Sequence, residues 1–288
     1  METILRVENL SKRFPGFTLD GVGFQVPRGT VMGFIGRNGA GKTTTIKLIM
    51  NLLKRDGGLV EVFGLDTEKH GAAVREKIGF VYDELFFYGM LTGEQMRRAV
   101  APHYRGWDED RFRRYALDFE LDLKKPVEKL SKGQKTKLSL AIALSHGAEL
   151  IVMDEPTSGL DPVFRAELLD VLYAVIQDDR KSVFFSTHIT ADLEKIADYI
   201  TFIDGGRMVF SESKDAVMDR YRIVRGPAGA MTSEVRPLCV GTRSTASGFE
   251  ALTERVEEMA PIVGPRAVVE RATLDDIMVY TAGRQADA

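Results

Sequence analysis

The fold is decided by the stretch Gly36-Arg37-Asn38-Gly39-Ala40-Gly41-Lys42-Thr43, which matches the glycine-rich phosphate-loop pattern in full. A short apolar run at 31–35 precedes it, and a helix-forming run from Lys42 to Met50 follows it. This order predicts a buried parallel strand, a tight loop and a helix. The backbone N–H groups of such a loop and the positive end of the helix dipole both attract phosphate oxygens. We therefore expect an α/β fold of the P-loop NTPase class.

The loop carries the groups needed to hold ATP together with Mg²⁺. Lys42 supplies a positive charge between the terminal phosphates, and the Thr43 hydroxyl is placed to bind Mg²⁺, which takes few protein ligands. The nucleotide is expected to contact Gly36, Arg37, Asn38, Gly39, Ala40, Gly41, Lys42, Thr43 and Thr44.

A second motif, much further along the chain, carries two carboxylates. It is the apolar strand candidate Leu150-Ile151-Val152-Met153-Asp154-Glu155-Pro156. Phosphate-loop ATPases place such a strand end beside the loop. We expect Asp154 to hold Mg²⁺, directly or through water, and Glu155 to be the catalytic base that polarises the attacking water. The alternative is an acidic turn without function, and the pairing with the phosphate loop argues against it.

Composition limits the partners and the compartment. The 288 residues are 44% hydrophobic and carry a formal net charge of -3, so they can bury a sizeable core and give no reason to expect nucleic acid as a partner. Cys239 is the single cysteine and cannot form an internal disulfide, and the first residues lack a signal-peptide pattern. No apolar run approaches the roughly twenty residues that span a bilayer. We expect a cytoplasmic protein without direct membrane insertion.

The pattern along the chain predicts a large domain at 1–213 and a small α+β appendage at 214–288. Alternating residues near the start predict an N-terminal antiparallel β subdomain. Helix formers dominate the middle of the chain, which predicts a helical insert at about 85–147. In the appendage we expect strands at 221–224 and 238–240, followed by a charged helix at 250–259.

Three further segments make the sequence similar to a known family. They are Leu130-Ser131-Lys132-Gly133-Gln134, then Ser158-Gly159-Leu160-Asp161, and then a lone histidine, His188. In this order they resemble the signature sequence, the D-loop and the switch histidine of the nucleotide-binding domain of the ATP-binding cassette (ABC) family. The resemblance covers about residues 3–210. It implies an ABC ATPase in which His188 contacts the γ-phosphate and the attacking water.

The resemblance implies a head-to-tail dimer. A signature at a helix N-terminus forms a second anion site, which lies too far from the phosphate loop of its own chain to share its nucleotide. Each ATP is then held between Lys42 of one subunit and the signature of the other, which is a second copy or a paralogous ATPase subunit. The residues contributed to this composite site are Ser131, Gly133, Gln134 and, as a link between the two sites, Asp161.

Three positions depart from the family's usual pattern. Lys132 stands where glycine is most common in the signature. Asp83 stands where a glutamine usually senses Mg²⁺; an anionic oxygen still suits the metal, and Glu84 is the alternative substitute. Phe14 stands where a tyrosine usually stacks on adenine, and it keeps the aromatic face.

Transport is also implied by the resemblance alone. In transporters the region of residues 85–91, which is rich in aromatic side chains here, receives a short helix of an integral membrane permease; packing of the insert is the alternative. The stretch 272–278 resembles the end of ATPase subunits of bacterial drug or antibiotic exporters. We expect an exporter subunit at the inner face of the cell membrane. A non-transport ABC ATPase acting on nucleic acid or the ribosome is the other possibility, and residues 214–288 either sense a ligand or brace the dimer.

Overall fold

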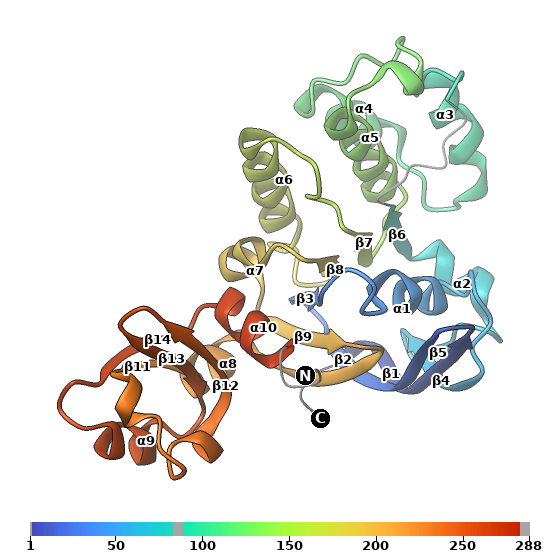
Figure 1. Ribbon diagram of the computed structural model, residues 1–288. Coiled ribbons are helices and arrows are strands. Elements are labelled where there is room, and N and C mark those ends of the chain that lie inside the picture. Colours follow the sequence, from blue (N-terminus) through green and yellow to red (C-terminus); the bar gives the residue numbers. More distant parts are fainter. Residues whose placement is uncertain (1, 83–88, 283–288) are drawn as a thin grey trace. The chain divides into compact units, whose positions relative to one another are not determined.

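The computed structural model describes residues 2–82 and 89–282. The chain divides into two compact units, Met1–Ser211 and Glu212–Ala288. The junction lies two residues before the expected boundary at 213/214. Figure 1 shows a first unit in which strands and helices alternate, and a second, smaller unit of strands and short helices.

A six-stranded sheet forms the centre of the first unit, in the order β10-β9-β3-β8-β7-β6. Its strands are β3 (Val31–Ile35), β6 (Ile78–Val81), β7 (Leu150–Asp154), β8 (Ser182–Thr187), β9 (Tyr199–Asp204) and β10 (Arg207–Ser213). The pairs β3–β8, β3–β9, β7–β8 and β6–β7 are parallel. Every residue of β3, β7 and β8 is buried, as expected for parallel strands covered on both faces. The carboxyl ends of these three strands therefore lie at one edge of the sheet.

A four-stranded antiparallel sheet, in the order β2-β1-β4-β5, packs beside this centre. Its strands are β1 (Thr3–Phe14), β2 (Phe17–Pro27), β4 (Gly57–Val62) and β5 (Leu65–Asp66). The ring of Phe24 on β2 stacks on Phe184 of β8 with 5.3 Å between centroids and lies 5.5 Å from Phe34 of β3. Helix α1 (Lys42–Ile49) buries Ile46 and Ile49 in the same core. The predicted N-terminal antiparallel subdomain and α/β core are confirmed.

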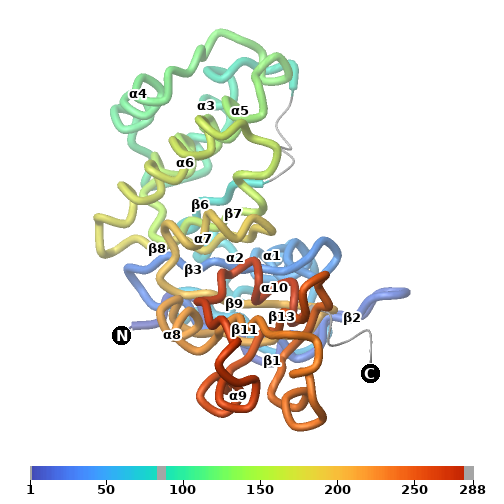
Figure 2. Tube along the Cα trace, turned by 60° about the vertical axis from the view of Figure 1, so that its left-hand side comes forward, coloured from blue at the N-terminus to red at the C-terminus, as the bar shows by residue number. Residues whose placement is uncertain are grey.

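Among the described residues, three α-helices lie between β6 and β7 in the sequence, and Figure 2 shows them close to one another. They are α3 (Gly93–Val100), α4 (Glu109–Asp118) and α5 (Lys132–Ser145). Helix α5 packs closely against β6. A Cβ added to Gly79 on β6 would lie only 2.8 Å from the Cβ of Ala143 on α5. The described part of the predicted helical insert is therefore helical, and α5 is fixed to the central sheet.

The remaining helices of the first unit stand next to its strands in the sequence. Helix α2 (Gly71–Glu76) precedes β6, helix α6 (Pro162–Val175) follows β7, and helix α7 (Thr190–Ile196) follows β8. Short 3-10 turns cover Ala101–His103 and Val127–Lys129.

The second unit is built on a sheet in the order β12-β13-β11-β14, with each neighbouring pair antiparallel. Its elements are α8 (Lys214–Arg220), β11 (Arg222–Gly226), β12 (Cys239–Thr245), β13 (Gly248–Thr253), α9 (Val256–Val263), β14 (Val268–Arg271) and α10 (Leu274–Ala282). Two 3-10 turns, Ala228–Ala230 and Arg236–Leu238, join β11 to β12.

The helix expected at 250–259 is partly wrong, because residues 248–253 form a strand and the helix begins at Val256. Strand β13 lies in the interior of the sheet and pairs with both β11 and β12. It buries Phe249 and Ala251 with Met259 and Val263 of α9. Pairing with two other strands thus outweighs the helix propensity of residues 250–252.

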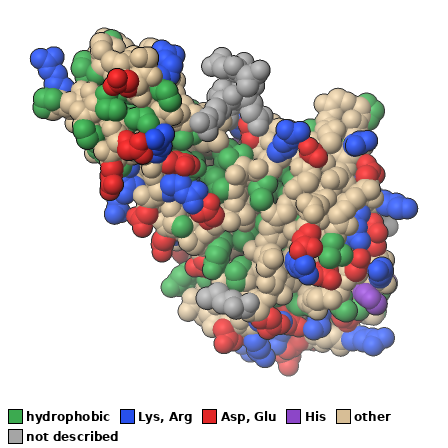
Figure 3. All heavy atoms as spheres, turned by 90° about the horizontal axis from the view of Figure 1, so that it is seen from below, with side chains coloured by type: hydrophobic (Ala, Val, Ile, Leu, Met, Phe, Trp, Pro, Cys, Tyr) green, Lys and Arg blue, Asp and Glu red, His purple; other side chains and the backbone are tan. Residues whose placement is uncertain are grey.

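Charged side chains of both signs are interspersed over the face shown in Figure 3. This distribution agrees with the small formal net charge of -3. Among the described residues, no helix is long and apolar enough to cross a membrane.

Candidate nucleotide site

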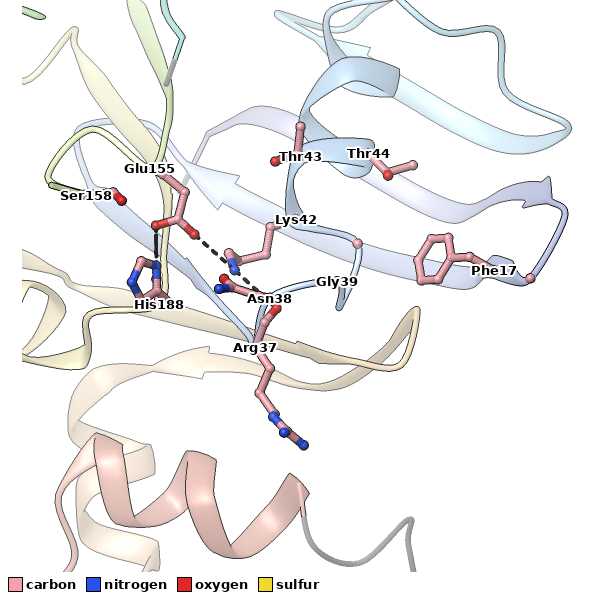
Figure 4. Close-up of a pocket in the computed structure, with 12 residues that line it drawn as sticks. Phe17, Arg37, Asn38, Gly39, Lys42, Thr43, Thr44, Glu155, Ser158 and His188 are labelled. Atoms are coloured by element: carbon pink, nitrogen blue, oxygen red, sulfur yellow. Dashed lines mark hydrogen bonds and ion pairs between the residues drawn. The ribbon is translucent and has the colours of Figure 1, made fainter. Parts of the chain in front are cut away.

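A cavity of about 720 Å³ opens at the edge of the sheet where β3, β7 and β8 end (Figure 4). The residues that line it are Gly16, Phe17, Arg37, Asn38, Gly39, Gly41, Lys42, Thr43, Thr44, Glu155, Ser158 and His188. Most of the predicted phosphate-loop residues are in this set, together with the predicted base and the predicted switch histidine. Residues from four separate parts of the sequence, 16–17, 37–44, 155–158 and 188, therefore face one space.

The phosphate loop keeps its shape through glycines that no larger residue replaces easily. Gly41 has a φ of 109°, in the left-handed region, and it is the N-cap of α1. A Cβ on Gly36 would be 2.4 Å from the carbonyl oxygen of Ile203. Lys42 is 5% exposed, and its Nζ donates to the carbonyl oxygens of Gly36 at 2.7 Å and Arg37 at 3.3 Å. The ammonium group is thus held over the loop that carries it.

The end of β7 is held by Ser186 of the neighbouring strand β8. The Ser186 hydroxyl donates to Asp154 Oδ1 at 2.6 Å, and Asp154 is 3% exposed. The backbone N–H of Glu155 donates to Ser186 O and to Ser186 Oγ, both at 3.1 Å. Glu155 has a φ of 46°, a left-handed conformation that is uncommon for a residue other than glycine. Such a strained turn is typical of a functional site, and it turns the Glu155 side chain toward the cavity.

Glu155 joins the phosphate loop to His188. Its Oε1 lies 3.0 Å from Lys42 Nζ, and its Oε2 lies 2.7 Å from His188 Nδ1 (Figure 4). The backbone N–H of His188 also donates to Oε2, at 3.3 Å. The carboxylate therefore stands between a cation that can bind phosphate and an imidazole at the mouth of the cavity. This arrangement can bind a polyphosphate and remove a proton from a water molecule beside it.

Two of the three predicted metal ligands lie within the described residues. Thr43 lines the cavity, whereas Asp154 is not in the lining and directly precedes Glu155. Hydroxyl and carboxylate oxygens are donors that suit Mg²⁺. Asp83 and its alternative Glu84 lie outside the described residues. Tyr82 directly precedes these residues. Its pKa is raised by burial and, to a smaller extent, by the negative charge of Asp154, so Tyr82 lies close enough to feel that carboxylate.

The aromatic side chain in the cavity is Phe17, not the expected Phe14. Phe14 is 37% exposed, and its ring centroid lies 6.4 Å from that of Phe17. The two residues are paired across the β1–β2 hairpin, so they stand side by side at its tip. Phe17 Cζ lies 3.0 Å from where a Cβ on Gly41 would stand, which places this ring against the phosphate loop. The Pro-Gly turn at 15–16 was the available sequence signal for this pairing.

The signature residues Ser131, Gly133 and Gln134 are not in the lining of the cavity. Ser131 is the N-cap of α5, and its side chain and that of Gln134 form a capping box with two 3.2 Å hydrogen bonds. A Cβ on Gly133 would be 2.7 Å from the ring of Phe164, so glycine is required there for α5 to approach α6. Their donors therefore lie at a separate helix N-terminus.

Asp161 and Lys132 lie at the junction of α5 and α6. Asp161 is the N-cap of α6, and its Oδ1 accepts from the backbone N–H groups of Val163 at 3.1 Å and Phe164 at 3.0 Å. Lys132 Nζ lies 3.8 Å from where a Cβ on Gly159 would stand. The unusual lysine of the signature is therefore close to the D-loop of its own chain. Ala40, another predicted loop residue, is 3% exposed and absent from the lining.

Comparison with known proteins agrees with this geometry. A sequence profile described as ABC transporter matches residues 19–158, a range that includes the phosphate loop and both carboxylates. The bacitracin transport ATP-binding protein BcrA of Bacillus licheniformis is 31% identical over 227 residues, which are 77% of this chain and 74% of that protein. The daunorubicin resistance ATP-binding protein DrrA3 of Streptomyces coeruleorubidus is 31% identical over 98% of this chain and 96% of its own length. The chain belongs to the ABC transporter family. Within this family it is an ATPase, the subunit that binds and hydrolyses ATP.

Other ABC transporter proteins extend the comparison to the whole chain and to the fold. The fluoroquinolones export ATP-binding protein of Mycobacterium tuberculosis is 30% identical over 98% of this chain and 94% of its own length. A solved ATP-binding subunit of an ABC transporter superposes with a TM-score of 0.65 and 28% identity, over 75% of this chain and 92% of that one. The structure of cbiO1 from Clostridium perfringens shares the fold, with a TM-score of 0.65 and 24% identity over 76% of this chain and 92% of that one.

Proposed function

We propose that this ATPase drives the export of a drug-like or antibiotic molecule through a separate membrane permease. The alignments that support this proposal cover 98% of the chain, so they include the second unit as well as the ATPase unit. Those two relatives are named for daunorubicin resistance and for fluoroquinolone export. Similarity of the second unit is the informative part, because the ATPase unit is common to ABC proteins of many functions.

In the proposed reaction, Glu155 is the general base. ATP binding brings the β- and γ-phosphates to Lys42, which then leaves Glu155 Oε1 for the phosphate oxygens. The released oxygen accepts a proton from the water that attacks the γ-phosphorus, and the β–γ bridging oxygen leaves with ADP. His188 holds Glu155 Oε2 and the γ-phosphate in line. Thr43 and Asp154 would hold Mg²⁺, which would neutralise charge on the phosphates.

The proposed catalytic unit is a head-to-tail dimer. Ser131, Gly133 and Gln134 offer hydrogen-bond donors at the N-terminus of α5, a 14-residue helix, yet they do not line the cavity of their own chain. A second copy or a paralogous subunit brings them to the γ-phosphate from the opposite side. Nucleotide binding then favours the dimer, and hydrolysis weakens it.

The proposed docking surface for the permease lies around residues 85–91, at the cytoplasmic face of the membrane. Of these residues, 85–88 lie outside the described ranges. Met90 is described, and 84% of its surface is exposed, which is unusual for a large apolar side chain on a monomer. An apolar anchor beside an aromatic segment suits a helix of a membrane partner.

Co-expression tests this proposal. The chain is expressed with and without a permease of about six transmembrane helices encoded beside its gene, and its amount in the membrane fraction is measured. Recruitment is expected only with the permease, and Met90→Asp should reduce it without changing the ATPase activity of the isolated chain. Leu52→Asp is the matched control, because Leu52 is also exposed, at 50%, and lies elsewhere. If Met90→Asp and Leu52→Asp are recruited equally well, the permease does not dock at Met90. If the permease recruits no chain to the membrane and nucleic acid stimulates the ATPase activity, the chain has the non-transport function instead of export.

A further inference from the structure

A partly buried ion pair links helices α6 and α7. Arg165 on α6 donates from Nε to Asp192 Oδ1 on α7, with 2.5 Å between the two atoms. The Asp192 side chain is completely buried, whereas Arg165 is 28% exposed. Neither residue lines the nucleotide cavity. No sequence motif pointed to this pair, because the two residues lie 27 positions apart.

Asp192 depends on Arg165 for its place. The second carboxylate oxygen, Oδ2, is buried and has no hydrogen-bond partner among the described residues. A buried carboxylate that loses its cation has to take up a proton or move toward water, since an uncompensated charge in the interior is very unfavourable. Removing the guanidinium therefore displaces the first turn of α7 or changes the charge at its centre.

The first turn of α7 is directly connected to His188. Asp192 lies four residues after the histidine, and α7 (Thr190–Ile196) has only seven residues, so it has little rigidity of its own. Leu193 packs one face of α7 tightly against Gly33 of the sheet. A Cβ added to Gly33 would lie only 2.2 Å from Leu193 Cδ2. The ion pair with Arg165 fixes the neighbouring position. Rotation or withdrawal of this turn shifts the backbone of His188 and thus its 2.7 Å contact with Glu155.

We propose that Arg165 is a positioning residue for ATP hydrolysis, which holds the imidazole of His188 against Glu155 through Asp192. Arg165 also lies one helical turn after the N-cap of α6, since its backbone N–H donates to the carbonyl oxygen of Asp161 at 3.0 Å. Arg165 thus contacts the start of α6 through its backbone and the start of α7, which follows His188, through its side chain. This inference rests on the catalytic role proposed above for His188.

Steady-state ATPase kinetics of Arg165→Met and Asp192→Asn test this inference. A misplaced catalytic group lowers kcat between about 10-fold and 100-fold, whereas KM for ATP should change by less than about 2-fold because the phosphate loop is untouched. Arg165→Lys should recover part of kcat, since it restores a cation. Glu167→Gln is the matched control: Glu167 is also on α6 and forms a 2.9 Å ion pair, with Lys137, and its loss should leave kcat unchanged.

The decisive comparison uses a His188→Ala background. If Arg165 acts through His188, Arg165→Met should lower kcat no further in that background. A reduction by the same factor in both backgrounds overturns the inference, and so does a lower melting temperature with an unchanged kcat. If Arg165→Met does not fold, Asp192→Asn answers the same question, because it keeps the side-chain shape and carries no charge. If His188→Ala itself leaves kcat unchanged, the role of His188 fails first, and the inference fails with it.

Discussion

Glu155 Oε2 lies 2.7 Å from His188 Nδ1, while the other oxygen of the same carboxylate lies 3.0 Å from Lys42 Nζ. Glu155 and His188 directly follow β7 and β8, and Lys42 begins α1 after the loop that follows β3, so the parallel sheet brings all three to one edge. Bound triphosphate has to compete with Glu155 for Lys42. This competition links nucleotide binding to the proposed base, because Oε1 is paired with Lys42 until Lys42 turns to phosphate.

Lys42 and Glu155 are predicted to have separable effects. Lys42→Ala removes the cation that binds the terminal phosphates, so the Kd for ATP should rise by at least about tenfold. Glu155→Gln should lower kcat by about 100-fold or more, because the amide cannot accept the proton, and it should leave the Kd for ATP near that of the wild type. Nucleotide titration and single-turnover hydrolysis measure the two quantities. Equal loss of ATP affinity in both variants would contradict the assigned roles.

Phe17 is predicted to contribute more to ATP binding than Phe14. Stacking of an aromatic ring on a base contributes about 1–3 kcal/mol, so Phe17→Ala should raise the Kd for ATP by roughly 5-fold to 150-fold. Phe14→Ala should have a smaller effect, because Phe14 does not line the cavity. Titration of both variants with ATP and with inorganic triphosphate gives the measurement. A larger effect of Phe14→Ala, or the same loss of affinity for triphosphate, would mean that Phe17 does not stack on the base.

His146 is predicted to make stability depend on pH. Its side chain is 4% exposed and stacks on Tyr104 with 3.9 Å between ring centroids, and burial lowers its pKa below the ordinary value of 6.5. The folded chain therefore holds the neutral imidazole, while the unfolded chain takes up a proton once the pH falls below 6.5. Stability is full above that pH and declines from there down to the folded-state pKa.

Urea unfolding at about pH 7.5 and about pH 5.5 checks this prediction. In the wild type, the free energy of unfolding should be lower at about pH 5.5 than at about pH 7.5. In His146→Gln this decrease should be smaller. His103→Gln, which changes an exposed histidine, is the control and should keep the wild-type pH dependence. An unchanged pH dependence in His146→Gln would exclude His146 as its source.

The sequence was most informative where chemistry imposes local spacing. The phosphate loop, the apolar strand ending in Asp154 and Glu155, and the signature stretch from Leu130 to Gln134 are all patterns within a few residues. Such patterns can be read without knowledge of tertiary contacts. The α/β class and the antiparallel N-terminal sheet follow from the same local alternation and burial patterns.

The features that could not be predicted depend on contacts between distant residues. Phe17 enters the cavity because the β1–β2 hairpin brings it beside the phosphate loop. Arg165 meets Asp192 because α6 and α7 pack together. Strand β13 forms at residues 248–253 because two other strands pair with it there. In each case tertiary packing decides the outcome: the Pro-Gly turn at 15–16 signals the hairpin but not its place beside the phosphate loop, and no short pattern signals the other two contacts.

Sedimentation of the Glu155→Gln chain with ATP and Mg²⁺, with and without the further change Ser131→Arg, tests the composite site most directly. Glu155→Gln should sediment as a dimer that retains ATP, and the added Ser131→Arg should leave a monomer that still binds ATP. Wild-type turnover should rise more steeply than in proportion to protein concentration, and Ser131→Arg should abolish it. Full turnover by a Ser131→Arg monomer, in direct proportion to its concentration, would contradict the account.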